Sequence, residues 1–155
     1  MSLRVNDPAP LFESVSEDGQ KFSLSDLVGK TNIVLYFYPK DFTTGCTREA
    51  CSFRDSFSKI LSLGATVVGI SSDNPETHME FKEKYGLQFV LLSDQDRSIR
   101  RLYGVDGRFL PPRATFVIDK NGKLVSIFNS QLSISKHVET AINALEKITS
   151  EVVST

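Results

Sequence analysis

The chain has 155 residues, of which 40% are hydrophobic and 24% charged, and its formal net charge is −1. We therefore expect a single globular domain over residues 1–155, and the composition excludes a disordered chain. The balanced charge gives no indication of nucleic-acid binding, and no apolar run approaches the ~18 residues of a membrane span. Because the N-terminus lacks a signal or transit pattern, we expect a cytoplasmic protein, or a plastid protein after removal of its transit peptide.

Hydrophobic spacing predicts strands that alternate with helices. The nearly continuous apolar run 32–38 is typical of a central strand covered on both faces. Asn74-Pro75 resembles a helix N-cap followed by its first residue, and residues 119–122 form a strong hairpin-turn signal. In chain order, the predicted elements are a hairpin at 11–24, a strand at 32–38, a helix at 50–60, a strand at 66–70, a helix at 75–85, a strand at 89–92, a helix at 96–103, two strands at 114–118 and 124–128, and a last helix that starts near 133–135.

This order of elements predicts an α/β fold with an N-terminal hairpin. Strands that alternate with helices, followed by a hairpin and a closing helix, imply a mixed central sheet with helices on both faces. In such folds the ends of the central strands, where helices begin, are favoured places for chemistry. Residues 39–46 lie at such a place.

Cys46 and Cys51 are the only cysteines in the chain, too few for a disulfide framework. They are either two small buried hydrophobic residues or a redox pair. Cys46 falls in the first turn of a helix that follows a buried strand, where free amides and the helix dipole stabilise a thiolate. Thr43 stands at the N-cap position, and its hydroxyl can bond a backbone N–H, the sulfur or a substrate oxygen. Pro39 stiffens the end of the strand.

The spacing of the two cysteines has a geometric consequence. Two helical residues five apart have Cα atoms roughly 8.5 Å apart, whereas a disulfide needs Cα atoms within about 7 Å. If Cys46 and Cys51 form a disulfide, residues 46–51 must unwind. The pair therefore indicates a catalytic disulfide linked to a conformational change and not a static cross-link.

Several motifs resemble the peroxiredoxin family. Pro39, Thr43 and Cys46 form a Pro-x-x-x-Thr-x-x-Cys pattern that is similar to the peroxiredoxin active-site signature, and Cys51 five residues later resembles the peroxiredoxin Q/bacterioferritin comigratory protein branch. Thr44 departs from the pattern, which usually has proline there. Further similar segments are Val5–Pro10, Leu91–Asp94, Arg113–Asp119 and Asn129–Val138.

The resemblance implies a thioredoxin-like fold and a thiol peroxidase that reduces hydrogen peroxide and organic hydroperoxides. Cys46 would be the peroxidatic thiolate, Thr43 would bind the peroxide oxygens, and Arg113 would stabilise the thiolate and the separating oxygens. Glu49 would hold that arginine. Cys51 would resolve the sulfenic acid to a disulfide, which thioredoxin or a similar dithiol would reduce. The resemblance implies no metal and no other cofactor, and because there is no third cysteine we expect a monomer.

Other interpretations of these residues remain open. Cys51 could be a buried helix residue, with an outside thiol resolving the sulfenic acid instead. Arg113 could form a plain surface ion pair. His78 and His137 are interpreted as structural, since neither pairs with the cysteines at the spacing of a zinc site.

Two other functions also fit a redox pair. A disulfide oxidoreductase would suit the fold, but such enzymes typically carry a Cys-x-x-Cys motif instead of this longer interval. A thiol-switched binding or chaperone module would use oxidation to unwind the helix and expose Phe53 and Phe57. Peroxide turnover with a dithiol reductant distinguishes an enzyme from such a switch, which would be oxidised slowly and stoichiometrically.

Overall fold

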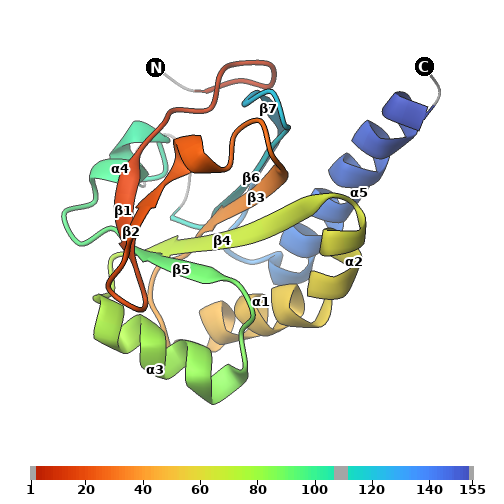
Figure 1. Ribbon diagram of the computed structural model, residues 1–155. Coiled ribbons are helices and arrows are strands. Elements are labelled where there is room, and N and C mark those ends of the chain that lie inside the picture. Colours follow the sequence, from red (N-terminus) through yellow and green to blue (C-terminus); the bar gives the residue numbers. More distant parts are fainter. Residues whose placement is uncertain (1–2, 107–111, 154–155) are drawn as a thin grey trace.

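The computed structural model describes residues 3–106 and 112–153, and Figure 1 shows a central sheet with helices on both sides. The strands are β1 (Glu13–Ser16), β2 (Lys21–Ser23), β3 (Asn32–Phe37), β4 (Ala65–Ser71), β5 (Val90–Ser93), β6 (Ala114–Ile118) and β7 (Leu124–Asn129). The helices are α1 (Thr44–Asp55), α2 (Phe57–Ser62), α3 (Pro75–Tyr85), α4 (Ser98–Leu102) and α5 (Ile134–Val153), with a 3-10 turn η1 (Leu24–Asp26).

The strands form one mixed sheet in the order β2-β1-β5-β4-β3-β6-β7. β3, β4 and β5 run parallel to one another, whereas β1, β6 and β7 pair antiparallel with their neighbours. The hairpin of β1 and β2 lies at one edge, where Val15 of β1 pairs with Ser93 of β5. The α/β class, the mixed sheet and the N-terminal hairpin predicted from the sequence are confirmed.

β3 lies inside the sheet, and all of its residues are buried. Its side chains alternate between two apolar clusters. Val34 and Tyr36 pack with residues of α1, α2, α3 and α5, whereas Ile33 and Leu35 pack with residues of α4 and η1. Because both faces of the strand are covered, its sequence is continuously apolar and shows no polar alternation.

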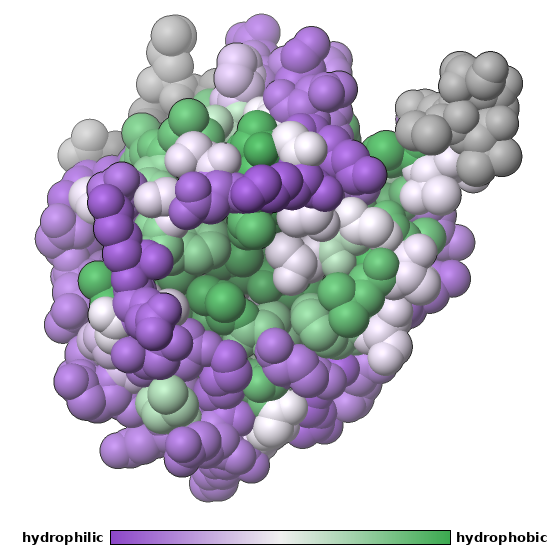
Figure 2. All heavy atoms as spheres, viewed as in Figure 1, coloured by the Kyte–Doolittle hydropathy of each residue, from purple (hydrophilic) through white to green (hydrophobic). Residues whose placement is uncertain are grey.

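The helices cover the two faces of the sheet unequally. Figure 1 shows α1, α2, α3 and α5 on one face and α4 on the other. The last helix predicted from near 133–135 is confirmed as α5, whose Val138, Ala141 and Leu145 are buried in the cluster that holds Val34 and Tyr36. Figure 2 shows apolar residues near the middle of the viewed face, surrounded by hydrophilic ones. Within the described ranges, no helix combines the length and the apolar character that crossing a bilayer needs.

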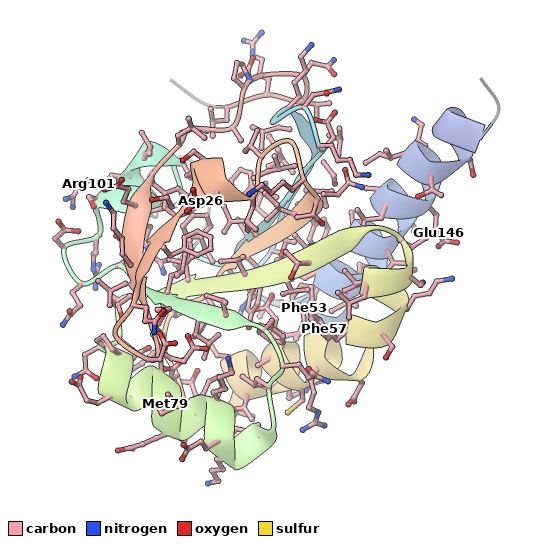
Figure 3. All side chains as sticks on the ribbon, viewed as in Figure 1. Asp26, Phe53, Phe57, Met79, Arg101 and Glu146 are labelled. Atoms are coloured by element: carbon pink, nitrogen blue, oxygen red, sulfur yellow. The ribbon has the colours of Figure 1, made fainter. Side chains whose placement is uncertain are left out.

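The prediction of one helix at 50–60 is wrong, because the chain forms two helices there. α1 begins at Thr44, directly after the predicted N-cap Thr43, and Ser56, with φ −100° and ψ 3°, separates it from α2. Phe53 of α1 and Phe57 of α2 both lie beneath the sheet in Figure 3. The apolar spacing reports only the buried faces, which continue from one helix to the next, and the polar first turn of α1 carries no apolar pattern.

Candidate active site

Cys46 lies in the first turn of α1, directly after the loop that leaves β3, as the sequence predicts. Thr47 makes the first helical hydrogen bond, to the Thr43 carbonyl at 2.8 Å, so the amides of Gly45 and Cys46 have no acceptor within the helix. These amides and the positive end of the helix dipole favour a negative charge on the sulfur. Cys46 is 1% exposed and its thiol is free.

Arg113 brings a guanidinium to this sulfur. Its Nη2 donates to Cys46 Sγ at 3.3 Å, and its Nη1 donates to Glu49 Oε1 at 2.6 Å. Arg113 and Cys46 meet because β6 pairs antiparallel with β3, which places the start of β6 beside the end of β3. Gly45 leaves room for the guanidinium, since a Cβ at that position would lie 3.1 Å from Arg113 Nη2.

Glu49 follows Cys46 by three residues on α1 and is fully buried. Burial raises the pKa of Glu49 to about 7, although the charge of Arg113 opposes the rise. Burial also disfavours the charged form of Arg113, but the Glu49 and Cys46 charges outweigh it, so the pKa of Arg113 is raised. One guanidinium therefore serves two acidic groups, and a carboxyl that titrates near neutral pH lies close to the thiol.

His137 of α5 lies behind Glu49, a contact that nothing in its spacing to the cysteines predicts. Its Nδ1 lies 3.6 Å from Glu49 Oε2 and 2.8 Å from Thr115 Oγ1, and its Nε2 donates to the Ser130 carbonyl at 2.8 Å. Burial lowers the pKa of His137, and because Nε2 donates to a carbonyl, Nδ1 of the neutral imidazole can accept from the Thr115 hydroxyl. One sequence signal was available: His137 stands four residues before Ala141, on the stripe of α5 that faces the core.

Thr43 occupies the N-cap position of α1, with an extended backbone at φ −79° and ψ 154°. Its side chain makes no capping hydrogen bond to a helix amide, and the hydroxyl donates to the Lys40 carbonyl at 2.9 Å. Phe42, with φ 68°, turns the chain so that this carbonyl lies beside the hydroxyl. The exposed Thr43 oxygen keeps its capacity to accept a hydrogen bond.

The remaining two predicted site residues, Cys51 and Pro39, make no hydrogen bond to the Cys46 sulfur within the described part of the chain. Cys51 lies in the same helix, half-buried and with a free thiol. In an intact helix the two Cα atoms are roughly 8.5 Å apart, beyond the range of a disulfide, so residues 46–51 would have to leave the helical form. Pro39 directly follows the buried Tyr38 at the end of the β3 segment.

Arg100 of α4 is a buried residue that no motif in the sequence indicates. Its Nη2 donates to the Tyr38 carbonyl at 2.8 Å, and its Nη1 donates to the Pro112 carbonyl at 3.0 Å. These carbonyls immediately precede Pro39 and Arg113 in the sequence. Arg100 therefore joins the two chain segments that carry the site.

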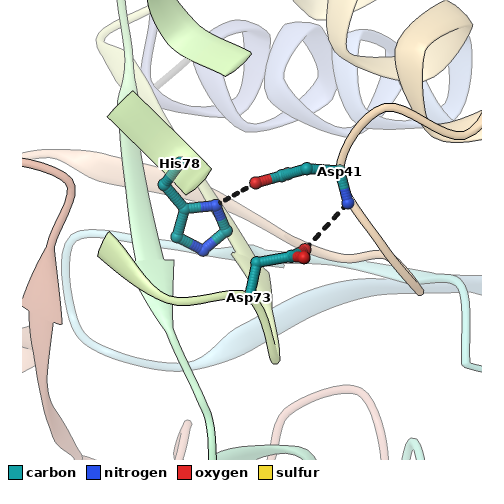
Figure 4. Close-up of side chains that lie close together, drawn as sticks. All are labelled: Asp41, Asp73 and His78. Carbon is teal, nitrogen blue, oxygen red and sulfur yellow. Dashed lines mark hydrogen bonds and ion pairs between the residues drawn. The ribbon is translucent and has the colours of Figure 1, made fainter. Parts of the chain in front are cut away.

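Asp41, Asp73 and His78 form a second cluster beside the same loop, with one ligand atom from each lying within 4.8 Å of the others (Figure 4). Carboxylate and imidazole groups are donors that divalent metal ions use. Each of these atoms already has a hydrogen-bond partner within the protein, however: Asp41 contacts Tyr38 and His78, and Asp73 accepts from Ser71 and from the Asp41 amide. The arrangement therefore fits a hydrogen-bonded network better than a metal centre.

Comparison with known proteins shows the family of this chain. The family model described as AhpC/TSA family matches residues 5–127. This chain belongs to that family. A Coxiella burnetii protein named "putative peroxiredoxin bcp" is 41% identical over 153 residues, and the match covers 94% of this chain and 100% of the relative.

Two further similarities confirm the resemblance to the peroxiredoxin Q and bcp branch. The chloroplastic peroxiredoxin Q of Gentiana triflora is 44% identical over 140 residues, and the match covers 88% of this chain and 64% of the relative. The chain thus spans just under two thirds of that plant protein. The crystal structure of peroxidoxin BcpB from Mycobacterium tuberculosis matches with a TM-score of 0.87 at 34% identity, over 94% of this chain and 98% of that one. The thioredoxin-like peroxiredoxin fold is therefore confirmed.

Proposed function

We propose that this peroxiredoxin is a thiol-dependent peroxidase in which the Cys46 thiolate attacks hydrogen peroxide or an organic hydroperoxide. The observation that carries the proposal is the 3.3 Å contact between Arg113 Nη2 and the Cys46 sulfur at the N-terminus of α1. The guanidinium and the free amides stabilise the thiolate. The same donors are available to the negative charge that develops on the departing oxygen.

The first step transfers one oxygen atom to the sulfur. The thiolate attacks the nearer peroxide oxygen, the O–O bond breaks, and the farther oxygen leaves as hydroxide or alkoxide. Cys46 becomes a sulfenic acid, and the leaving group takes a proton to give water or an alcohol. Thr43 binds the peroxide oxygens through its exposed hydroxyl, and Glu49 holds Arg113 through the 2.6 Å contact between Oε1 and Nη1.

The second step uses Cys51 as the resolving thiol. Its sulfur attacks the Cys46 sulfur, a disulfide forms, and the sulfenic oxygen leaves as water. Because both residues belong to α1, this step requires residues 46–51 to unwind. A dithiol reductant of the thioredoxin type then restores both thiols and is itself oxidised to a disulfide.

The burial of Cys46 favours a small molecule as the first reactant. At 1% exposure, the sulfur is closed to a disulfide on a second protein, which a disulfide oxidoreductase would have to engage, and a small peroxide needs the least opening to reach it. The exposed apolar side chain of Phe42, next to Thr43, is compatible with organic hydroperoxides as well as hydrogen peroxide.

The cysteine content also bears on the partners. Because one chain supplies both thiols, the cycle needs no second subunit, and a monomer suffices. Both thiols must be returned to the reduced state after each turnover. We therefore place the protein in a compartment with a dithiol reductant, the cytoplasm or a plastid.

Substitution of the two cysteines tests the proposal. Cys46→Ser is expected to reduce consumption of hydrogen peroxide to background, measured with thioredoxin, thioredoxin reductase and NADPH as the reducing system. Cys51→Ser is the matched control in the same helix, and we expect it to be oxidised once at nearly the normal rate but not to turn over. Retained consumption by Cys46→Ser would overturn the proposal, and normal turnover by Cys51→Ser would assign resolution to an outside thiol.

A further inference from the structure

A buried pair, Asp41 and His78, joins the loop between β3 and Cys46 to helix α3 (Figure 4). Asp41 Oδ2 lies 2.6 Å from His78 Nδ1, and Asp41 Oδ1 accepts from the Tyr38 hydroxyl at 2.5 Å. Asp41 is 2% exposed and His78 is 0% exposed. The loop that leads to the peroxidatic cysteine is thus bonded to a neighbouring helix in a site without water access.

The hydrogen bonds of His78 indicate where its protons lie. Its Nε2 is 3.0 Å from the Leu92 carbonyl, which can only accept, so Nε2 carries a hydrogen. Its Nδ1 faces an Asp41 oxygen at 2.6 Å, a hydrogen-bond distance. Removal of either side chain would leave a buried polar group without its partner.

The backbone of the same loop is constrained as well. The Asp41 amide donates to Asp73 Oδ2 at 2.8 Å. The next residue, Phe42, has φ 68°, a left-handed conformation that a residue with a side chain keeps only where its surroundings impose it. Thr43 is the next residue and Cys46 follows three residues later, so the position of Asp41 bears on how the chain enters α1.

We propose that the Asp41–His78 pair is a positioning element for the peroxidase reaction, because it sets the loop conformation that presents Thr43 and the first turn of α1 to the peroxide. The proposal rests on the proposed function. Among the contacts that the structure describes, neither residue touches Cys46, so the pair acts through the loop. It serves the first oxidation, whereas resolution by Cys51 takes place after the first turns of α1 have unwound.

Asp41→Ala provides the main test. Because small displacements of reacting groups slow a reaction strongly, we expect oxidation of Cys46 by hydrogen peroxide to slow by about 10- to 100-fold in stopped-flow measurements. The later rate of disulfide formation with Cys51 should stay within about threefold of wild type. Amide hydrogen exchange of residues 40–46 should become faster.

Asp41→Asn separates positioning from a requirement for charge or for a metal ion. The asparagine Oδ1 can accept from Tyr38, and its Nδ2 can donate to Nδ1 of a neutral His78, so every hydrogen bond of the pair can be remade. We expect this variant to regain an oxidation rate within about fivefold of wild type. An asparagine variant as slow as Asp41→Ala would overturn the proposal.

Asn74→Ala is the control for helix stability. Asn74 Oδ1 accepts from the Thr77 amide at 2.8 Å, so the substitution weakens the start of α3 without altering the pair. Its oxidation rate should match wild type, and a loss equal to that of Asp41→Ala would reduce the pair to a structural role. If Asp41→Ala does not fold, His78→Leu removes the other member of the pair, and a wild-type oxidation rate in that variant would contradict the proposal.

The outcomes also separate this proposal from the proposed function. Slow oxidation of the wild-type protein by peroxide would refute the peroxidase itself. In that case, amide exchange of residues 40–46 in Asp41→Ala still decides whether the pair positions the loop: unchanged exchange would refute it.

Discussion

Two buried carboxyl groups, those of Asp41 and Glu49, lie on either side of Cys46 in the sequence, and each has a histidine beside it. Both oxygens of Asp41 are hydrogen-bonded, one of them to His78 Nδ1 at 2.6 Å. Glu49 Oε2 lies 3.6 Å from His137 Nδ1 and has no hydrogen-bond partner in the described part of the chain. One network is complete and the other is not.

The difference corresponds to two tasks. The complete network is the one that we propose to hold the loop before Cys46 in one conformation. The incomplete network leaves a carboxyl group that can gain or lose a proton, and burial raises its pKa to about 7. In the proposed cycle the Cys46 thiolate becomes a neutral sulfenic acid, and Glu49 is then the only anion bonded to Arg113 among the described residues. We therefore expect the Glu49 carboxyl to release its proton more readily at that stage.

We expect the largest effect on the oxidation rate from removal of Arg113, the cation bonded to Glu49. Arg113→Met takes away the donor to both Cys46 and Glu49, and oxidation by hydrogen peroxide should slow by about 10²- to 10³-fold in stopped-flow measurements. Arg113→Lys is the matched variant. It keeps the charge but cannot donate to both partners in the same fork geometry, so an intermediate rate is expected. A wild-type rate for Arg113→Met would refute this part of the account.

The second prediction concerns pH and stability. Because the pKa of Glu49 is raised from its ordinary 4.5 to about 7 in the folded protein, the folded state binds more protons than the unfolded state between these values. The stabilisation is therefore full below pH 4.5 and is lost as the pH rises through 7, a change of about 3 kcal/mol. Glu49→Gln should remove this dependence, which urea unfolding at pH 5 and pH 8 would measure.

Wild type and Glu49→Gln must be compared, because His137 also makes the free energy of unfolding depend on pH, and in the opposite direction. Burial lowers the pKa of His137 from its ordinary 6.5, so its contribution is present above that value and is lost as the pH falls. The difference between variant and wild type isolates Glu49. A difference that is the same at pH 5 and pH 8 would show that the buried carboxyl does not titrate in this range.

We expect the smallest effect, a change in stability alone, from a substitution at Thr44, which lies between Asp41 and Glu49 in the sequence. This residue is the first of α1, and it follows a Thr43 backbone at φ −79° and ψ 154°, which is compatible with a following proline. Thr44→Pro should raise the free energy of unfolding by about 0.4–1 kcal/mol and leave both networks and the rate of the first oxidation unchanged. Thermal unfolding and stopped-flow oxidation would check the two halves of this prediction.

Local patterns in the sequence were enough to predict the strands, the closing helix and the place of Cys46 in a first helical turn. The break at Ser56 was not predictable, because the apolar spacing continues across it. The partners of the two histidines were not predictable either. Asp41 meets His78 across 37 residues, and such pairs depend on how α3 and α5 pack against the sheet. The expectation that Arg113 serves the thiol came from family resemblance and not from any spacing.

The most direct test of the account is stopped-flow oxidation of the fully reduced protein by one equivalent of hydrogen peroxide, with free thiols counted at the end. We expect oxidation far faster than that of an unactivated cysteine and the loss of both thiols for each peroxide consumed. Oxidation as slow as that of an ordinary thiol would contradict the assignment of Cys46 as a peroxidatic cysteine.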